Sequence, residues 1–224
     1  MKITYLGQAG LMLESQGLRV IVDPYLSNSV VTVNPRNWRR QPIDESFFDL
    51  RPDVLVFTHD HLDHYDPDTA ERFLQAYDGI TVLAPGTAWQ KAKQFGKLHN
   101  YVLFERHTQW THGHLRFTAV KATHSDPYAI GVIIEDGEKT YYITGDTLYN
   151  TEIFADLPKD IDVVFLPVNG LGNNMNATDA ARFFRETGGK VAVPFHVGMF
   201  DDLTAENFEA ENKVIPVIYE EIKL

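Results

Sequence analysis

The chain has 224 residues, of which 44% are hydrophobic and 23% are charged, which is ordinary for a soluble globular protein with a buried core. Its net charge of −11 argues against general binding to nucleic acids or anionic membranes, because the field of the protein would repel their phosphates. The sequence has no cysteine, which excludes disulfides and thiolate ligands, so any bound metal must be held by nitrogen and oxygen atoms.

The first predicted elements are short strands separated by glycine turns. A long irregular segment from Tyr25 to Pro42 follows them, and a loop of that length in a compact domain is more often functional than idle. An apolar strand then ends at a histidine-rich segment, after which helices and strands alternate. The predicted strands of this half are Lys2–Leu6, Leu11–Glu14, Leu18–Val22, Val54–Phe57 and Ile80–Ala84, and the helices are Pro67–Tyr77 and Thr87–Phe95.

The second half of the chain repeats this order of strands followed by alternating helices and strands. Asp136-Gly137, between two apolar runs, indicates a hairpin. The predicted strands are Tyr101–Phe104, His114–Lys121, Ala129–Glu135, Thr140–Thr144, Asp162–Leu166, Val191–Val193 and Val214–Tyr219, and the helices are Thr178–Thr187 and Thr204–Asn212. The pattern predicts an α/β (α+β) fold with two packed sheets inside outer helices, a four-layer αββα sandwich. We expect residues 1–224 to form a single domain made of two similar halves.

Residues 58–64 carry the clearest chemical signal, an H-x-H-x-D-H pattern that directly follows an apolar strand. Imidazole and carboxylate groups together bind zinc, manganese or iron. Alternate side chains of an extended chain share a side, so His59 and His61 can reach one ion together. Asp63 and His64 are displaced toward a second ion. A two-ion centre needs further ligands, and single residues of the right kind follow three other predicted strands: His124, Asp146 and His196.

This arrangement resembles the metallo-β-lactamase superfamily. The segments Y-L-G-Q-A-G at residues 5–10 and V-I-V-D-P-Y-L at residues 20–26 are similar to the branch that includes L-ascorbate-6-phosphate lactonase and uncharacterised metal-dependent hydrolases. The absence of cysteine excludes the subgroups that use a thiolate ligand. The resemblance implies two divalent metal ions, Zn²⁺ or Mn²⁺. The implied ligands are His59, His61 and His124 for one ion, Asp63, His64 and His196 for the other, and Asp146 bridging both.

The resemblance and the ligand pattern lead to the hypothesis of a dinuclear metal-dependent hydrolase. A metal-bridging hydroxide would attack a small ester, lactone or phosphate ester. Asp63 and Asp146 are the catalytic candidates: Asp63 would orient the hydroxide and pass a proton to the leaving group, while Asp146 would bridge the two ions.

Three residues are candidates for binding the substrate. Arg36 and Trp38 suit an anionic organic molecule, because a guanidinium binds carboxylate or phosphate and an indole face covers a ring. The alternative is an exposed loop whose arginines pair with acidic residues. Asn169 follows a predicted strand and is a candidate donor to a developing oxyanion, or else an asparagine in a turn before glycine. We expect Gln8 to support the site as a polar neighbour and residues 169–176 to form a wall of the pocket.

Two other functions stay open at this point, a phosphodiesterase or nuclease on the same scaffold and a non-catalytic metal-binding sensor. The acidic net charge counts against nucleic acid, and the complete ligand set counts against a sensor. No apolar run suits a signal peptide or a membrane span, so we expect a cytoplasmic protein without a membrane partner. We expect a small-molecule substrate, and the sequence leaves oligomerisation open. The remaining histidines, expected at the surface, are His99, His107, His112 and His114.

Overall fold

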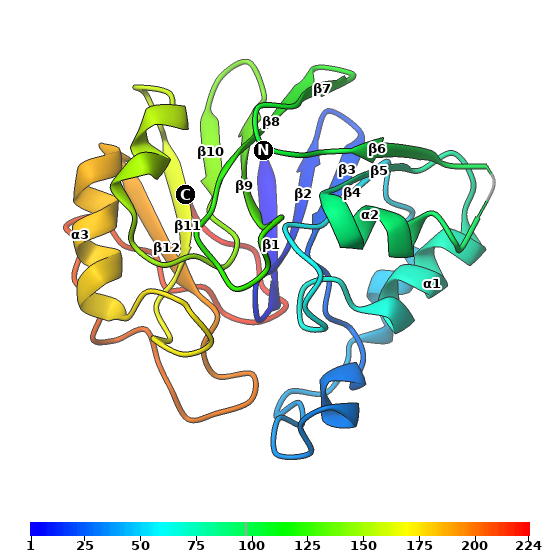
Figure 1. Cartoon of the computed structure of the whole chain (residues 1–224), viewed down its shortest axis with the longest axis horizontal. Helices are drawn as coiled ribbons and strands as arrows, with labels where there is room; N and C mark the ends of the chain where they lie inside the picture. The colour runs from blue at the N-terminus through cyan, green and yellow to red at the C-terminus, as the bar shows by residue number, and fades with distance from the viewer. Residues whose placement is uncertain (97) are drawn as a thin grey trace.

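The computed structural model describes residues 1–96 and 98–224 and shows two mixed β-sheets packed face to face, with helices on their outer sides (Figure 1). In the described residues, the first sheet has six strands in sequential order. The first three are antiparallel to their neighbours, and the third to sixth are parallel. The strands are β1 (Lys2–Gly7), β2 (Gly10–Ser15), β3 (Leu18–Val22), β4 (Val54–Val56), β5 (Thr81–Ala84) and β6 (Asn100–Leu103).

The second sheet, in the same described part of the chain, also has six strands in sequential order. It repeats the arrangement of the first, since antiparallel pairs come first and parallel pairs follow. The strands are β7 (Gln109–His112), β8 (Leu115–Lys121), β9 (Ile130–Glu135), β10 (Thr140–Ile143), β11 (Val163–Pro167) and β12 (Val191–Phe195). The hairpin predicted at Asp136-Gly137 joins β9 and β10 and is confirmed.

Two of the three α-helices of the described residues begin and end within one residue of their prediction, whereas the helix predicted at Thr87–Phe95 ends at Ala92. The Asp66 side chain accepts a hydrogen bond from the Asp68 amide and Pro67 is the first helical residue, so α1 (Pro67–Ala76) starts there. Gly188, with φ of 68°, closes α3 (Ala177–Thr187). The other elements are α2 (Gly86–Ala92) and the 3₁₀ helices Ser29–Thr32, Glu45–Asp49 and Thr151–Asp156.

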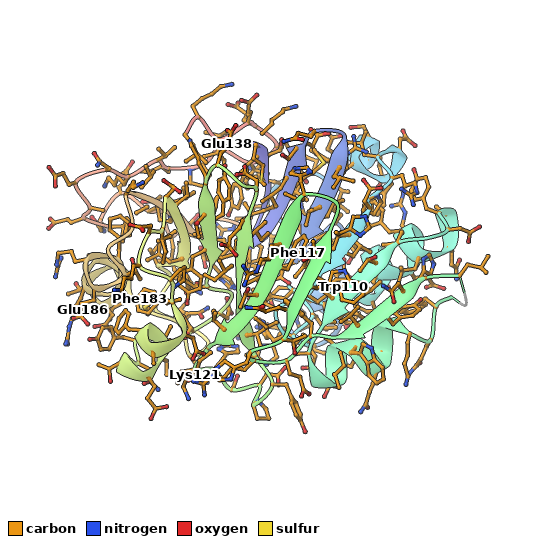
Figure 2. The ribbon with its side chains drawn as sticks, turned by 90° about the horizontal axis from the view of Figure 1, so that it is seen from above. Trp110, Phe117, Lys121, Glu138, Phe183 and Glu186 are labelled. Carbon is orange, nitrogen blue, oxygen red and sulfur yellow. The ribbon has the colours of Figure 1, made fainter. Side chains whose placement is uncertain are left out.

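Apolar side chains fill three layers between these elements. The inner faces of both sheets share one core, in which Phe117 and Phe165 are fully buried. α1 and α2 cover the outer face of the first sheet, where Phe73 is buried, and α3 brings Phe183 onto the outer face of the second. Figure 2 shows Phe117 on a strand in the middle of the molecule and Phe183 at the outer helix. The predicted αββα sandwich is therefore confirmed.

The carboxyl-terminal segment differs from its prediction. Neither the helix Thr204–Asn212 nor the strand Val214–Tyr219 forms. Pro216 has no amide hydrogen to donate to a strand ladder, and the segment instead makes isolated bonds to the outer strands of both sheets. The Val214 amide donates to the Ala192 carbonyl of β12 at 2.9 Å, and the Ile222 amide donates to the Ile3 carbonyl of β1 at 2.8 Å. The segment thus protects the two sheet edges.

None of the helices in the described residues is long and apolar enough to cross a membrane.

Candidate metal centre

Strand ends place the predicted ligands at one edge of the two sheets. β4 leads directly into residues 58–64. In the second sheet, β8 and β10 are both antiparallel to β9, and β10 to β12 are parallel. The loops after β8, β10 and β12 therefore leave from the same edge, and they carry His124, Asp146 and His196.

Gly145 allows this edge to approach the histidine-rich segment. Its φ is 60°, and a Cβ at this position would lie 2.8 Å from the Ile130 carbonyl oxygen and 2.9 Å from the Thr58 Cβ. The Ile130 amide in turn donates a hydrogen bond to the Thr58 carbonyl at 3.0 Å. Because glycine has no Cβ and tolerates positive φ, the residue before Asp146 can contact the start of residues 58–64.

All seven side chains predicted as metal ligands lie together. Among the described residues they form three overlapping groups, in each of which one ligand atom per residue lies within 4.8 Å of the others. The groups are His59, His61 and His124; His59, His64 and Asp146; and Asp63, His64 and His196. These seven residues are called the candidate metal centre below. No ligand role is established by proximity alone, so each role stays a prediction.

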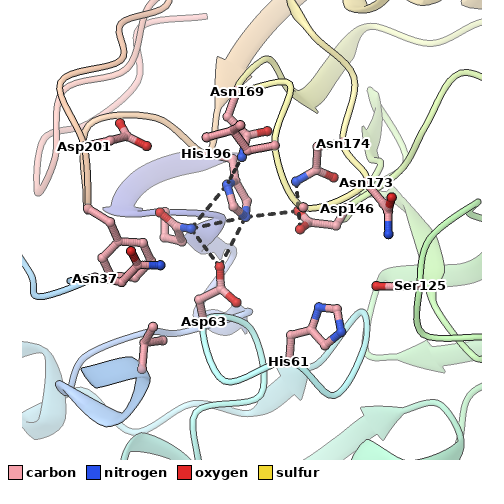
Figure 3. A pocket seen from close by; sticks show the side chains of 15 residues that line it. Asn37, His61, Asp63, Ser125, Asp146, Asn169, Asn173, Asn174, His196 and Asp201 are labelled. Carbon is pink, nitrogen blue, oxygen red and sulfur yellow. Dashed lines mark hydrogen bonds and ion pairs between the residues drawn. The ribbon is translucent and has the colours of Figure 1, made fainter. Parts of the chain in front are cut away.

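Asp146 connects the groups, and its surroundings are shown in Figure 3. Its Oδ1 atom lies 3.2 Å from Nε2 of His64 and 3.2 Å from Nε2 of His196. Its Oδ2 atom lies 3.9 Å from Nε2 of His124, on the other side of the carboxylate. Asp63 Oδ2 lies 3.3 Å from Nε2 of His196. The carboxylate of Asp146 therefore faces both sets of ligands that the sequence predicts for two ions.

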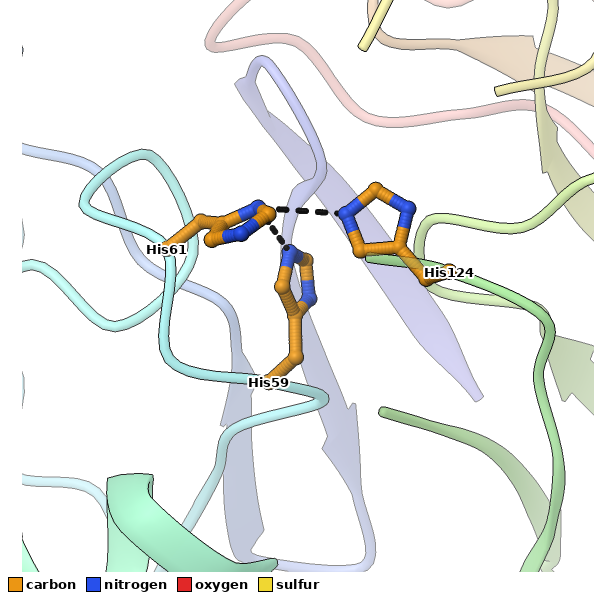
Figure 4. A group of neighbouring side chains, drawn as sticks. All are labelled: His59, His61 and His124. Atoms are coloured by element: carbon orange, nitrogen blue, oxygen red, sulfur yellow. Dashed lines mark hydrogen bonds between the residues drawn. The ribbon is translucent and has the colours of Figure 1, made fainter. Parts of the chain in front are cut away.

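The group His59, His61 and His124 is a set of imidazoles whose ring nitrogens converge (Figure 4). Nδ1 of His61 lies 3.1 Å from Nε2 of His59 and 3.1 Å from Nε2 of His124. The Nδ1 atom of His124 lies 3.2 Å from the Asn173 carbonyl, which can accept its proton. That hydrogen bond leaves Nε2 of His124 with a free lone pair for a metal.

The donor atoms fit divalent cations. The Nε2 atoms of His64 and His196 face each other at 3.2 Å, and the buried Asp146 Oδ1 has no well-formed hydrogen bond in the structure. A buried acceptor without a partner is costly. A cation among these lone pairs satisfies all of them, and imidazole with carboxylate is a donor set that zinc and manganese accept.

Asp23 also belongs to the site, although the sequence places it only at the end of a strand. Its Oδ2 atom lies 2.8 Å from Nδ1 of His64, and its Oδ1 accepts the Thr58 amide at 2.8 Å. The carboxylate thus orients His64 with Nε2 toward the centre, as carboxylates behind metal-bound histidines commonly do. The available signal was its place in V-I-V-D, at the end of a strand that pairs with β4.

Amide side chains orient the other ligands. Gln8 donates from Nε2 to Asp63 Oδ2 at 2.7 Å, which agrees with its expected supporting place, and Asn174 donates to Asp146 Oδ2 at 2.8 Å. Asn169 Nδ2 lies 3.1 Å from Nδ1 of His196, while its buried Oδ1 has no hydrogen bond. A half-turn of this amide lets Oδ1 accept the Nδ1 proton, which leaves Nε2 of His196 for a metal.

Burial and opposite charges shift the titration of the centre. Burial lowers the pKa of His196, but Asp146 and Asp63 outweigh it and raise that pKa to about 9. Burial likewise raises the pKa of Asp146, but His196 and His64 outweigh it and hold that pKa well below its usual range. Burial, together with the neighbouring His64, lowers the pKa of His59. If His196 is a metal ligand, binding of the metal there would release a proton and would weaken as the pH falls.

A cavity of about 380 Å³ opens beside the centre and is lined by Asp63, Asp146 and His196 among others. Asn169 also lines it, and so do Leu171, Gly172, Asn173 and Asn174, so part of the predicted wall 169–176 borders the cavity. Arg36 and Trp38 are not among its lining residues, although Asn37 is. Arg36 is exposed, and Trp38 is 56% exposed. The substrate roles of Arg36, Trp38 and Asn169 stay predictions.

The four remaining histidines have partners elsewhere. Their ring nitrogens contact the Leu74 carbonyl, the Asp156 carboxylate and the hydroxyls of Thr81 and Ser15. None of them belongs to a group of potential metal ligands in the described residues. Of the four, which were expected at the surface, His107 is exposed and His99, His112 and His114 are half-buried.

Comparison with known proteins identifies the family of the chain. The family described as "Beta-lactamase superfamily domain" matches residues 18–197. A UPF0173 metal-dependent hydrolase of Exiguobacterium sp. is 32% identical over 216 residues, which cover 89% of this chain and 87% of the relative.

Solved structures agree on the fold. A metallo hydrolase of Ignicoccus hospitalis has a TM-score of 0.74 at 19% identity, with 98% of this chain and 96% of that chain covered. An isothiocyanate hydrolase from Delia radicum gut bacteria has a TM-score of 0.75 at 19% identity, with 100% of this chain and 99% of that chain covered.

Proposed function

The chain belongs to the metallo-β-lactamase superfamily of metal-dependent hydrolases, and on that basis we propose that it hydrolyses a small ester, lactone or phosphate ester at a centre of two divalent cations. The observation that carries the proposal is the position of Asp146. Its two carboxylate oxygens face different ligand groups, Oδ1 toward His64 and His196 and Oδ2 toward His124.

In this proposal, one cation is held by His59, His61 and His124, and the other by Asp63, His64 and His196, with Asp146 shared between them. Zn²⁺ and Mn²⁺ both suit these nitrogen and oxygen donors. Such a pair of cations lowers the pKa of bound water and polarises the scissile group of the substrate.

The side chains of this centre have separate tasks in the proposal. Asp63 lines the cavity, and its Oδ2 atom lies 3.3 Å from Nε2 of His196. It is therefore placed to accept a proton from attacking water and to pass it to the leaving oxygen. Gln8 holds Asp63 in this orientation through the 2.7 Å hydrogen bond to Oδ2.

Metal analysis of the purified full chain, reloaded with Zn²⁺ or Mn²⁺ after chelation, tests the centre. We expect about two ions per chain in the parent protein. His61→Ala removes one ligand and should lower that number, whereas His107→Ala, an exposed histidine bonded to Asp156, should leave it unchanged. A folded parent protein that binds no metal would refute the proposed centre.

A parallel substrate screen tests the reaction. Carboxylic esters, lactones, phosphate monoesters and phosphodiesters, including a short RNA, are assayed with each metal restored. Turnover of a small carboxylic or phosphate ester supports the proposal. Turnover confined to phosphodiesters or RNA would instead favour a phosphodiesterase, and metal binding without any turnover would favour a sensor.

A further inference from the structure

The walls of the cavity differ chemically from its floor. The floor holds the ionisable ligands, among them Asp63, Asp146 and His196. The walls are formed mainly by neutral side chains: Asn37, Asn169, Asn173 and Asn174 supply amides, and Val30, Leu171 and Phe200 supply apolar surface. Among the described residues, no lysine or arginine lines the cavity, and the charged group on its wall is the carboxylate of Asp201.

Three arginines lie close in sequence to Asn37, and none of them lines the cavity: Arg36 is exposed, and the other two are engaged elsewhere. Arg39 is buried, and its guanidinium donates to the Tyr25 carbonyl and, at 2.7 Å, to the Tyr219 hydroxyl. Arg40 forms an ion pair with Asp202. Neither therefore supplies a cation to the cavity wall. A carboxylate or phosphate in the outer part of a substrate would find amides and an aspartate there, and it would be desolvated without a partner charge.

We propose that the cavity selects a neutral carboxylic ester or lactone whose outer part is uncharged and partly apolar. This inference rests on the proposed function and narrows it, since it excludes substrates that carry a carboxylate or phosphate in their outer part. Phe200 is held edge-on against Tyr25, with ring centroids 5.5 Å apart, and together with Leu171 it offers an apolar surface to the substituent. The wall amides suit neutral carbonyl and ether oxygens.

Hydrolysis of such a substrate needs water as its only other reactant. The water oxygen adds to the acyl carbon, the acyl carbon–oxygen bond breaks, and one proton passes to the departing alkoxide. An ester gives an alcohol and a carboxylic acid, and a lactone gives a single hydroxy acid; the new carboxyl group loses its proton at neutral pH.

A matched pair of esters tests the selectivity. Para-nitrophenyl butanoate and para-nitrophenyl hydrogen glutarate share the scissile group and differ mainly by a remote carboxylate. With metal restored, we expect kcat/KM for the neutral ester to exceed that for the anionic ester by about tenfold or more. Equal values, or a preference for the anionic ester, would overturn the inference.

A binding measurement separates this inference from the proposed function. The corresponding anilides, butyranilide and glutaranilic acid, are titrated calorimetrically against the metal-loaded full chain. Tighter binding of the neutral anilide supports the inference even if neither ester is hydrolysed, in which case the proposed function alone has failed. Tighter binding of the acid, or no binding of either anilide, would refute the inference.

Substitution of Asn37 provides a second test. Asn37→Lys places a cation on the wall and should shift the neutral-to-anionic ratio of kcat/KM toward the anionic ester by about tenfold. Asn37→Gln changes the length of the side chain without adding charge and should leave that ratio within about twofold of the parent value. An equal change in both variants would show that the charge of the wall does not set selectivity.

Discussion

The first sheet supplies four of the seven residues of the candidate metal centre from one loop after β4, whereas the second supplies three from separate loops after β8, β10 and β12. The first loop is braced locally, since the amides of His64 and Tyr65 both donate to the His61 carbonyl. In the second half, each residue depends on a different strand end. The centre therefore depends on local structure in one half and on the packing of a whole sheet in the other.

Backbone geometry sharpens this difference. His196, at the end of β12, has a φ of 66° and its amide donates to the Gln8 carbonyl at 2.8 Å, and Gln8 has a φ of 54°. Non-glycine residues rarely adopt positive φ. Each such conformation costs about 1 kcal/mol or more and persists only where the surrounding structure imposes it. Contacts between the two sheets thus hold His196 in place, while the histidine-rich segment combines its own turn with bonds to Asp23 and Ile130.

The largest expected effect comes from Asp146, the second-half residue that faces both ligand groups. Asp146→Asn keeps the size of the side chain but removes its charge and one metal-binding oxygen. We expect kcat/KM to fall by about a thousandfold or more, roughly 4 kcal/mol in transition-state stabilisation, and metal content to fall below that of the parent. Unchanged turnover with a full metal complement would show that the first loop alone suffices.

Gly145 provides the next largest effect, because it allows the two halves to approach. In Gly145→Ala the new Cβ meets the Ile130 carbonyl and Thr58 at a φ of 60°, so we expect a loss of about 3 kcal/mol in the free energy of unfolding by urea denaturation. Gly137→Ala is the matched control, since its φ is 89° but no atom lies within 4 Å of the new Cβ.

That control should lose about 1 kcal/mol, which isolates the backbone strain from the clash. Equal losses in both variants would mean that close approach at Gly145 contributes nothing to joining the halves.

The histidine cluster could be found from the sequence because its signal is local. His59 and His61, the predicted ligands of one ion, lie two residues apart after an apolar strand, which makes a compact pattern. The start of α1 at Asp66-Pro67 is an equally local signal. The second-half residues were recognisable only as single residues at predicted strand ends, and Asp146 needed the fold to show that its carboxylate faces both groups.

Long-range partners explain what sequence reasoning missed. Asp23 and His64 are 41 residues apart, and Asn174 and Asp146 are 28 apart, so no local pattern links either pair. At the carboxyl terminus, Ala205 and Phe208 are buried against the second sheet, and such spacing suggests a helix. The chain there instead follows the sheet edges, where partners far away in sequence determine its conformation.

The support of His64 by Asp23 gives a third test within the first half. Asp23→Asn removes the carboxylate behind the imidazole, so we expect metal affinity, measured by chelator competition, to fall about 10- to 100-fold. Asp53→Asn is the matched control, because Asp53 also accepts a strand amide, that of Arg19 at 2.9 Å, but contacts no histidine of the centre.

The control should bind metal like the parent protein. An Asp23→Asn variant with unchanged metal affinity would indicate that the turn of residues 58–64 positions His64 without the Asp23 carboxylate.

The smallest expected effect concerns Asp156, which supports the end of β8 ahead of His124. It accepts the Lys121 amide at 2.9 Å and pairs with Arg106 at 2.7 Å. The Arg106 guanidinium holds the pKa of this carboxyl well below its usual range against the effect of burial. A depressed pKa in the folded state gives stability that is present above the unfolded pKa of about 4 and is lost as the pH falls through the lowered value.

Asp156→Asn should therefore lower the free energy of unfolding by about 1 kcal/mol at pH 7, a modest figure because Arg106 is partly exposed, and by progressively less as the pH falls below about 4. Urea denaturation at several pH values measures this, and metal content at pH 7 should match the parent. Loss of metal without loss of stability would contradict this expectation. It would mean that Asp156 positions the loop of His124 directly, and that the packing of the second sheet alone does not.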